Sequence, residues 1–237
     1  MKKLLTAILA AAVAAASFYG CSQDGTPLDI QNPDSATEDE ILPALNENSI
    51  EPSPNVNGMR FTMTIEEFTE SYNEFKRTNG ENDLIMMGNW KQIDDESSDN
   101  KGVRVKYYYY DDENISFTAT VEAENDKLVN IGCGTTMSKF MAQNESGESN
   151  SEAVLYKAAV MAKTVCRFPK GSERVMQNIF YRTTTENLDS LWYQGFIFSL
   201  STQEDKTDSK NSVMLFRVFP ISDELRDDWN PEYFNPD

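Results

Sequence analysis

Residues 103–137 read VRVKYYYYDDENISFTATVEAENDKLVNIGCGTTM and carry the clearest structural pattern in the chain. Apolar or aromatic residues occupy alternate positions in 103–110 and again in 115–123, and a short polar turn separates the two runs. This two-residue period is typical of strands that bury one face, and two such runs joined by a turn predict an antiparallel hairpin. A further turn at 124–127 leads into 128–137, which we expect to be the third strand of a meander.

The strand at 103–110 presents two different faces. The face that we expect to pack on the core is aliphatic and aromatic, and consists of Val103, Val105, Tyr107 and Tyr109. The other face combines basic and aromatic side chains, and consists of Arg104, Lys106, Tyr108 and Tyr110. If exposed, this second face would form a stripe able to stack on a sugar ring or to bind an anionic or peptide ligand. The alternative is that the tyrosines only make cross-strand pairs, because aromatic residues favour strands.

Three segments carry helical signals. Thr64 and Glu67 form a capping-box pattern at the start of 65–78, where apolar residues recur at spacings of three and four. A second helix is expected to follow Ser149 and to stop before Pro169, and a shorter one to start near Ser172.

Three more apolar segments, 84–93, 191–201 and 213–219, are expected to be strands, with Trp90 as a buried anchor. The resulting order is α-β-β-β-β-α-α-β-β. Runs of strands that are separated from the helices indicate an α+β fold, with an antiparallel sheet and the helices packed on one face. A helix that leads into strands twice also allows a weak internal repeat.

The first 21 residues have the pattern of a targeting signal. Lys2 and Lys3 precede an apolar run at 4–16, and small residues then lead to Cys21. Such a run is typical of a secretory signal peptide and is too short to span a bilayer stably. The segment resembles the signal peptide of a bacterial lipoprotein precursor. The resemblance implies cleavage before Cys21, a lipid on Cys21 and an extracytoplasmic location at the cell envelope; secretion without a lipid is the alternative.

Three regions follow from these signals. Residues 1–20 are the expected signal peptide, and 21–57 an acidic, proline-containing tether with eight carboxylates and no Lys or Arg. Such a segment has few apolar residues to bury and favours flexibility. Residues 58–237 are expected to form a single α+β domain.

Charge and composition exclude several classes of function. The formal net charge of −18 argues against a nucleic-acid partner, because such a surface repels phosphates. The chain has no histidine, so it cannot form a Ser-His-Asp or Cys-His catalytic arrangement or a histidine-containing zinc site. We therefore expect no cofactor and no metal site.

Other residues that carry chemistry leave alternatives open. Cys133 and Cys166 either form a disulfide outside the cytoplasm or remain separate buried thiols. Acidic clusters at 94–96, 111–113 and 227–228 fall in expected turns, where solvated charge is the simplest interpretation.

The sequence therefore predicts a lipid-anchored, non-catalytic binding or adaptor protein of the cell envelope. Its partners would be the membrane, through the lipid, and a protein, peptide or glycan. One alternative is a carboxylate-based hydrolase of envelope glycans, which needs two carboxylates on either side of a sugar bond. The other is a purely structural envelope component.

Overall fold

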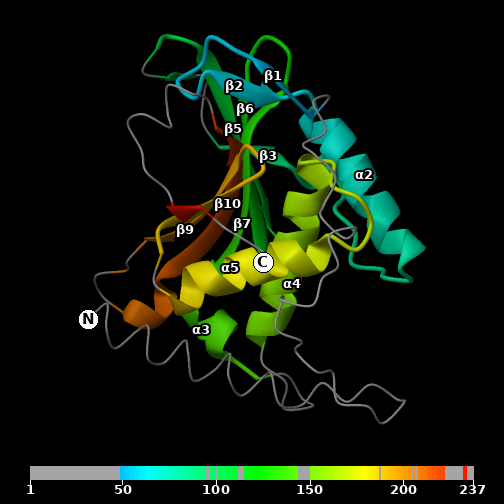
Figure 1. The fold of residues 1–237 in the computed structure, drawn as a ribbon, viewed down its shortest axis with the longest axis vertical. Coiled ribbons are helices and arrows are strands. Elements are labelled where there is room, and N and C mark those ends of the chain that lie inside the picture. The colour runs from blue at the N-terminus through cyan, green and yellow to red at the C-terminus, as the bar shows by residue number, and fades with distance from the viewer. Residues whose placement is uncertain are drawn as a thin grey trace.

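The computed structural model describes the following residues: 49–93, 97–99, 101–111, 115–143, 150–186, 188–203, 205, 208–221 and 232–233. They form a large, mainly antiparallel sheet with helices packed on one face, so the predicted α+β class is confirmed (Figure 1). The expected signal peptide, Cys21 and the acidic clusters at 94–96 and 227–228 lie outside the described residues.

Six strands make up the body of the sheet, in the spatial order β8-β9-β10-β7-β6-β5. Their bounds are β5 Arg104–Asp111, β6 Ser116–Glu122, β7 Leu128–Thr136, β8 Ser190–Tyr193, β9 Phe196–Gln203 and β10 Val213–Pro220. Short strands pair at the two edges: β3 (Lys91–Gln92) and β4 (Ser97–Ser98) with β5, and β11 (Glu232–Tyr233) with β8. The predicted meander at 103–137 is therefore confirmed as β5-β6-β7.

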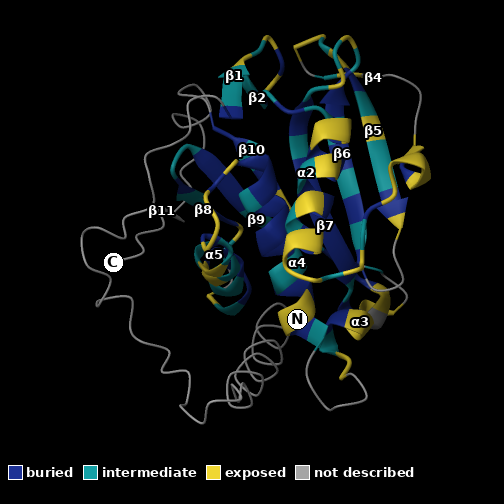
Figure 2. Cartoon of the chain, turned by 90° about the vertical axis from the view of Figure 1, so that its right-hand side faces the viewer, coloured by how far each residue is buried: buried dark blue, intermediate teal, exposed yellow. Residues whose placement is uncertain are grey.

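Helices α2 (Ile65–Thr78), α4 (Asn150–Val165) and α5 (Glu173–Thr185) cover the same face of the sheet (Figure 2). A short helix, α3 (Met137–Met141), follows β7 directly. The capping box of α2 is confirmed: the Thr64 hydroxyl accepts a hydrogen bond from the Glu67 N–H, and the Glu67 carboxylate accepts one from the Thr64 N–H. None of the helices in the described ranges is long and apolar enough to cross a membrane.

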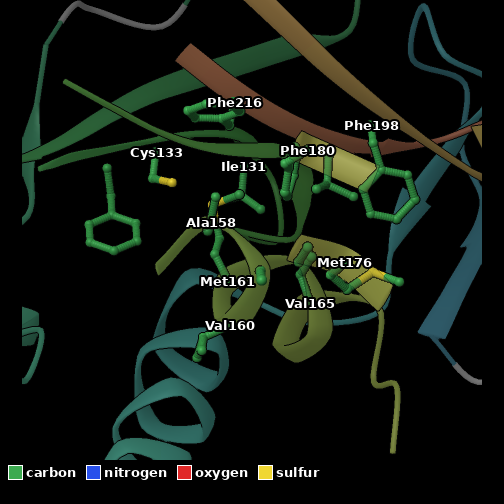
Figure 3. Close-up of a cluster of buried hydrophobic side chains, with 14 of the residues drawn as sticks. Ile131, Cys133, Ala158, Val160, Met161, Val165, Met176, Phe180, Phe198 and Phe216 are labelled. Atoms are coloured by element: carbon green, nitrogen blue, oxygen red, sulfur yellow. The ribbon is translucent and has the colours of Figure 1, made fainter. Parts of the chain in front are cut away.

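The centre of the core lies between α4 and the middle strands. Ala158, Met161 and Val165 of α4 are fully buried on the side of the helix toward the sheet and α5, while Val160 lies on the side toward α2 (Figure 3). A helix that is apolar on several sides must be covered on several sides, and α4 accordingly lies between α2 and the sheet. Next to it, the Phe180 ring of α5 packs edge-on against Phe198 and Phe216, with centroid distances of 5.7 and 5.3 Å.

The topology repeats once. Helix α2 precedes the meander β5-β6-β7, and helices α4 and α5 precede the meander β8-β9-β10. The last strands of the two meanders, β7 and β10, pair antiparallel at the centre of the sheet, with Cys133 opposite Phe216. The weak internal repeat expected from the element order is therefore present in the topology, as two similar halves joined along β7 and β10.

Two glycines allow β7 and β10 to pack closely. A Cβ at Gly134 would lie 2.5 Å from the Met214 carbonyl oxygen, and one at Gly132 would lie 2.8 Å from the Phe216 carbonyl oxygen. The side chain of Leu215 also lies within van der Waals distance of the Gly134 position. A residue with a side chain would thus collide with β10 at either position.

Two predicted strands are wrong in detail. Residues 84–93 contain only the two-residue strand β3 and a short 3₁₀ helix, Met87–Asn89, because the Trp90 side chain holds this segment against both α2 and the Tyr110 ring of β5. The Trp90 side chain is buried, as expected, and its Nε1 donates a hydrogen bond to the Thr69 hydroxyl at 3.1 Å. The segment 191–201 is a hairpin, β8-β9, because Gln194 and Gly195 both have positive φ, 48° and 79°, as a tight two-residue turn requires.

The expected tether also ends earlier than 57. Strand β1 (Ile50–Pro52) pairs antiparallel with β2 (Met59–Phe61), and Ser49 is fully buried. The domain therefore includes residues that composition assigned to the tether. The carboxylate among them, that of Glu51, forms ion pairs with Arg60 and Lys127.

Gly134→Ala is expected to lower the free energy of unfolding by about 2–3 kcal/mol, because its Cβ would displace the β10 backbone. Gly88→Ala is the matched control: no atom lies within 4 Å of its Cβ position, and a change below about 0.5 kcal/mol is expected. Urea unfolding measures both. Equal stabilities of the two variants would contradict the close approach of β7 and β10.

Candidate functional site

The predicted aromatic–basic stripe on β5 lies on the helix-covered face, so of the two alternatives the continuous exposed stripe is wrong. Tyr110 is buried, and its ring contacts Trp90 and Phe117 at centroid distances of 5.7 and 6.2 Å. Tyr108 is partly buried against the same core. Both faces of this strand carry tyrosines, so the alternation alone did not indicate which face is inside.

The two basic residues of the stripe reach solvent at the far end of the strand. Arg104 is exposed, and the Lys106 ammonium group forms an ion pair with Asp126 at 3.1 Å. The structure therefore separates Arg104 and Lys106 from the buried Tyr110. These four residues do not form one ligand-binding surface.

The opposite face of the sheet carries Tyr107, Tyr109 and Arg217. Tyr109 pairs with Thr118, which pairs with Gly132, which pairs with Arg217, so one row crosses four strands. Tyr107 is 38% exposed, and helices α2, α4 and α5 lie on the other face of the sheet (Figure 2). The Tyr109 hydroxyl is hydrogen-bonded to Ser116 at 3.1 Å.

Cys133 and Cys166 are both free and fully buried, so of the two alternatives the structure has separate thiols rather than a disulfide. Burial raises the pKa of each thiol well above its ordinary value. A thiol in this environment stays protonated and does not act as a nucleophile.

Glu122 is the centre of a buried polar cluster that attaches the β1-β2 hairpin to the sheet. Its carboxylate accepts hydrogen bonds from Ser53, Arg60, Asn55 and Asn125, the last two at 3.0 and 3.1 Å. Burial alone would raise the pKa of Glu122, but these donors outweigh it and hold the pKa below the ordinary value. Every polar group here has a partner inside the protein, which indicates a structural role.

A second ionic cluster joins α2 to α4. The Lys76 side chain is only 1% exposed and forms ion pairs with Glu81 and with Asp83, the latter at 2.9 Å. Lys157 pairs with Asp83 at 3.0 Å, and the Tyr156 hydroxyl donates to Glu81 at 2.8 Å. Two lysines and two carboxylates balance each other, so this cluster also has a structural explanation.

A cavity of about 440 Å³ opens between the N-terminal half of α2 and the C-terminal end of α4. Three of its lining residues are buried, Met63, Thr164 and Phe168, and we call them its floor. Its outer lining is polar, and consists of Glu67, Glu70, Ser71, Lys163 and Arg167. We call this cavity the α2–α4 pocket. The volume of this cavity lies within the range found for small-molecule sites, and most of the surface that lines it is polar.

The pocket has one acidic wall and one basic wall. Glu67 and Glu70 belong to α2, Lys163 lies in the last turn of α4, and Arg167 follows the end of that helix. Although all four side chains are described, no ion pair joins the two walls. The Lys163 ammonium group lies 4.1 Å from the centroid of the Phe75 ring, and burial lowers its pKa.

The basic wall depends on how α4 ends. The Phe168 N–H donates to the Lys163 carbonyl at 3.0 Å and the Arg167 N–H to the Thr164 carbonyl at 3.1 Å, which is the hydrogen-bond pattern of a Schellman motif. Arg167 therefore occupies the left-handed position of that motif, with φ of +55°, where glycine is usual. Phe168, the next residue, turns into the core and forms part of the pocket floor.

Sequence reasoning did not identify this pocket. The capping box located the start of α2, and Pro169 indicated the end of α4, but neither signal brings the two ends together. The arginine directly before Phe168 and Pro169, at a helix end without glycine, was the available clue.

Comparisons with protein families, with curated proteins and with solved structures gave no match to this chain. Its function is therefore argued from its own sequence and geometry.

Glu122→Gln is expected to lower the free energy of unfolding at pH 7 by about 2 kcal/mol, since Arg60 then loses a charged partner. The folded-state pKa of Glu122 is depressed, so its contribution to stability is fully present above the ordinary carboxyl pKa of the unfolded chain and is lost as the pH falls through the lower pKa of the folded state. The stability curves of the two proteins should therefore converge in acid.

Denaturant unfolding at a series of pH values measures this difference. Asp126→Asn is the control, because its ion pair with Lys106 is half exposed and a change below about 0.5 kcal/mol is expected. Curves for Glu122→Gln and the unmodified chain that stay parallel from neutral to acidic pH would rule out the proposed role of the Glu122 charge.

Proposed function

We propose that this protein is a lipid-anchored, non-catalytic binding protein of the bacterial cell envelope, and that its ligand enters the α2–α4 pocket. The N-terminal segment that ends at Cys21 supports the anchor and the location. The absence of histidine and the deep burial of Cys133 and Cys166 argue against nucleophilic catalysis.

The pocket is the observation that carries the proposal. It combines an apolar floor with charged groups of both signs that do not pair across it. Glu67, Glu70 and Arg167 are exposed to solvent, so a ligand that enters the cavity can reach carboxylates on one side and basic groups on the other.

The same geometry argues against a glycan hydrolase. The two carboxylates of the pocket, Glu67 and Glu70, lie three residues apart on one helix and form a single wall. A glycosidase needs carboxylates on opposite sides of the scissile bond. In addition, the Glu67 carboxylate is engaged by the Thr64 N–H in the capping box.

Cys21→Ala is expected to abolish lipid attachment, because no other residue of the signal segment carries a thiol. Expression in a bacterial host with radiolabelled palmitate, followed by membrane fractionation, measures both labelling and location. We expect the unmodified chain in the membrane fraction with label, and Cys21→Ala without label and outside that fraction.

Ser22→Ala is the matched control, since it changes the neighbouring residue and keeps the thiol. Its labelling is expected to equal that of the unmodified chain. A Cys21→Ala chain that is labelled and sedimented like the unmodified chain would show that the lipid anchor is wrong.

A further inference from the structure

Resting on the proposed function, we propose that the α2–α4 pocket binds a zwitterion of the amino-acid or short-peptide type. Arg167 and Lys163 bind its carboxylate, Glu70 binds its ammonium group, and the floor of Met63 and Phe168 receives an apolar side chain.

The charges of the pocket define this class of ligand. An anionic ligand would meet the carboxylates of Glu67 and Glu70 on α2, and a cationic ligand would meet Lys163 and Arg167 on α4. Like-charge contacts of this kind select against both. A ligand with one charge of each sign, separated by a short spacer, satisfies both walls at once.

Two of the four charges have an explanation within their own helices. Glu67 lies in the first turn of α2 and Lys163 in the last turn of α4, where each charge stabilises its helix through a favourable interaction with the helix dipole. Glu70 lies beyond the first turn of α2, and Arg167 lies beyond the last residue of α4. Among the described residues, neither Glu70 nor Arg167 has an ion pair or a side-chain hydrogen bond. Both side chains are exposed to solvent and accessible to a ligand.

The backbone of Arg167 is the second, independent observation. A non-glycine residue in the left-handed region costs about 1–2 kcal/mol, and the Schellman position of Arg167 would accept glycine without that cost. Local strain of this kind concentrates at ligand-binding sites, where a particular side chain must be presented. The planar guanidinium group is also the side chain best suited to bind a carboxylate with two parallel hydrogen bonds.

The size of the cavity limits the ligand to a small molecule. A volume of about 440 Å³ lies in the lower part of the range found for small-molecule pockets. A single amino acid or a short peptide fits this range, and the apolar floor favours one with an aliphatic side chain.

Isothermal titration calorimetry on the purified Cys21→Ala chain, which keeps every described residue, tests this proposal. The probes are alanyl-leucine, its N-acetyl form, its C-terminal amide and the doubly blocked peptide. We expect alanyl-leucine to bind with a Kd of about 1 mM or tighter, and each single block to weaken binding by about tenfold or more.

Two variants assign the charges to the walls. Glu70→Gln should weaken the binding of alanyl-leucine and make its affinity equal to that of the N-acetyl form. Arg167→Gly should instead make the affinity for alanyl-leucine equal to that for the amide. Arg167→Gly should also unfold at an equal or higher temperature, because glycine relieves the left-handed backbone; its loss of binding then cannot be attributed to misfolding. Glu66→Gln and Arg174→Ala, at exposed positions outside the pocket lining, are the charge-matched controls and should bind as the unmodified chain does.

Parallel titrations with citrate, spermidine and N,N′-diacetylchitobiose separate the class of ligand from the function. If one of these binds, alanyl-leucine does not, and Arg167→Gly or Glu70→Gln weakens that binding, the zwitterion is overturned and the pocket of the proposed function stands. If no probe gives a binding heat that Arg167→Gly or Glu70→Gln changes, both the zwitterionic ligand and the proposal that the pocket is a binding site are overturned.

Discussion

The antiparallel pairing of β7 with β10 is the contact on which the rest of the structure depends. It joins two halves, each made of a helical segment and a three-stranded meander, into one continuous sheet. The pairing is close because Gly132 and Gly134 present no side chain to the β10 backbone. On the helix-covered side of the same strands, Ile131, Cys133 and Phe216 form the surface on which α4 packs. The position of α4 therefore depends on the surface that β7 and β10 form together.

The α2–α4 pocket is a consequence of this arrangement. Helix α4 is covered by the sheet on one side and by α2 on another, so its C-terminal end lies beside the first turns of α2 (Figure 1). Acidic residues favour a helix start and basic residues a helix end, which places opposite charges on the two walls. What helix electrostatics does not explain is Arg167, at a left-handed position beyond the end of α4, and Glu70, beyond the first turn of α2. The proposed ligand accounts for both.

The sequence was most informative where local signals agree with the tertiary structure. The capping box at Thr64 and the alternation in 103–137 predicted α2 and the β5-β6-β7 meander, because both patterns depend on residues close together in the chain. The exposed face of β5 was not predictable, since tyrosines occur on both faces and Tyr110 is buried by its packing against Trp90 and Phe117. The pocket was missed for a similar reason: Glu70 and Arg167 are almost a hundred residues apart, and no local pattern brings them together.

Amide chemical-shift mapping on the isotope-labelled Cys21→Ala chain, titrated with alanyl-leucine, tests most directly whether the α2–α4 pocket is the binding site. The account predicts saturable shifts that cluster in 63–71 and 163–168, at the two walls and the floor. Shifts that cluster instead around Tyr107, Tyr109 and Arg217 on the opposite sheet face, or the absence of saturable shifts in 63–71 and 163–168, would contradict it.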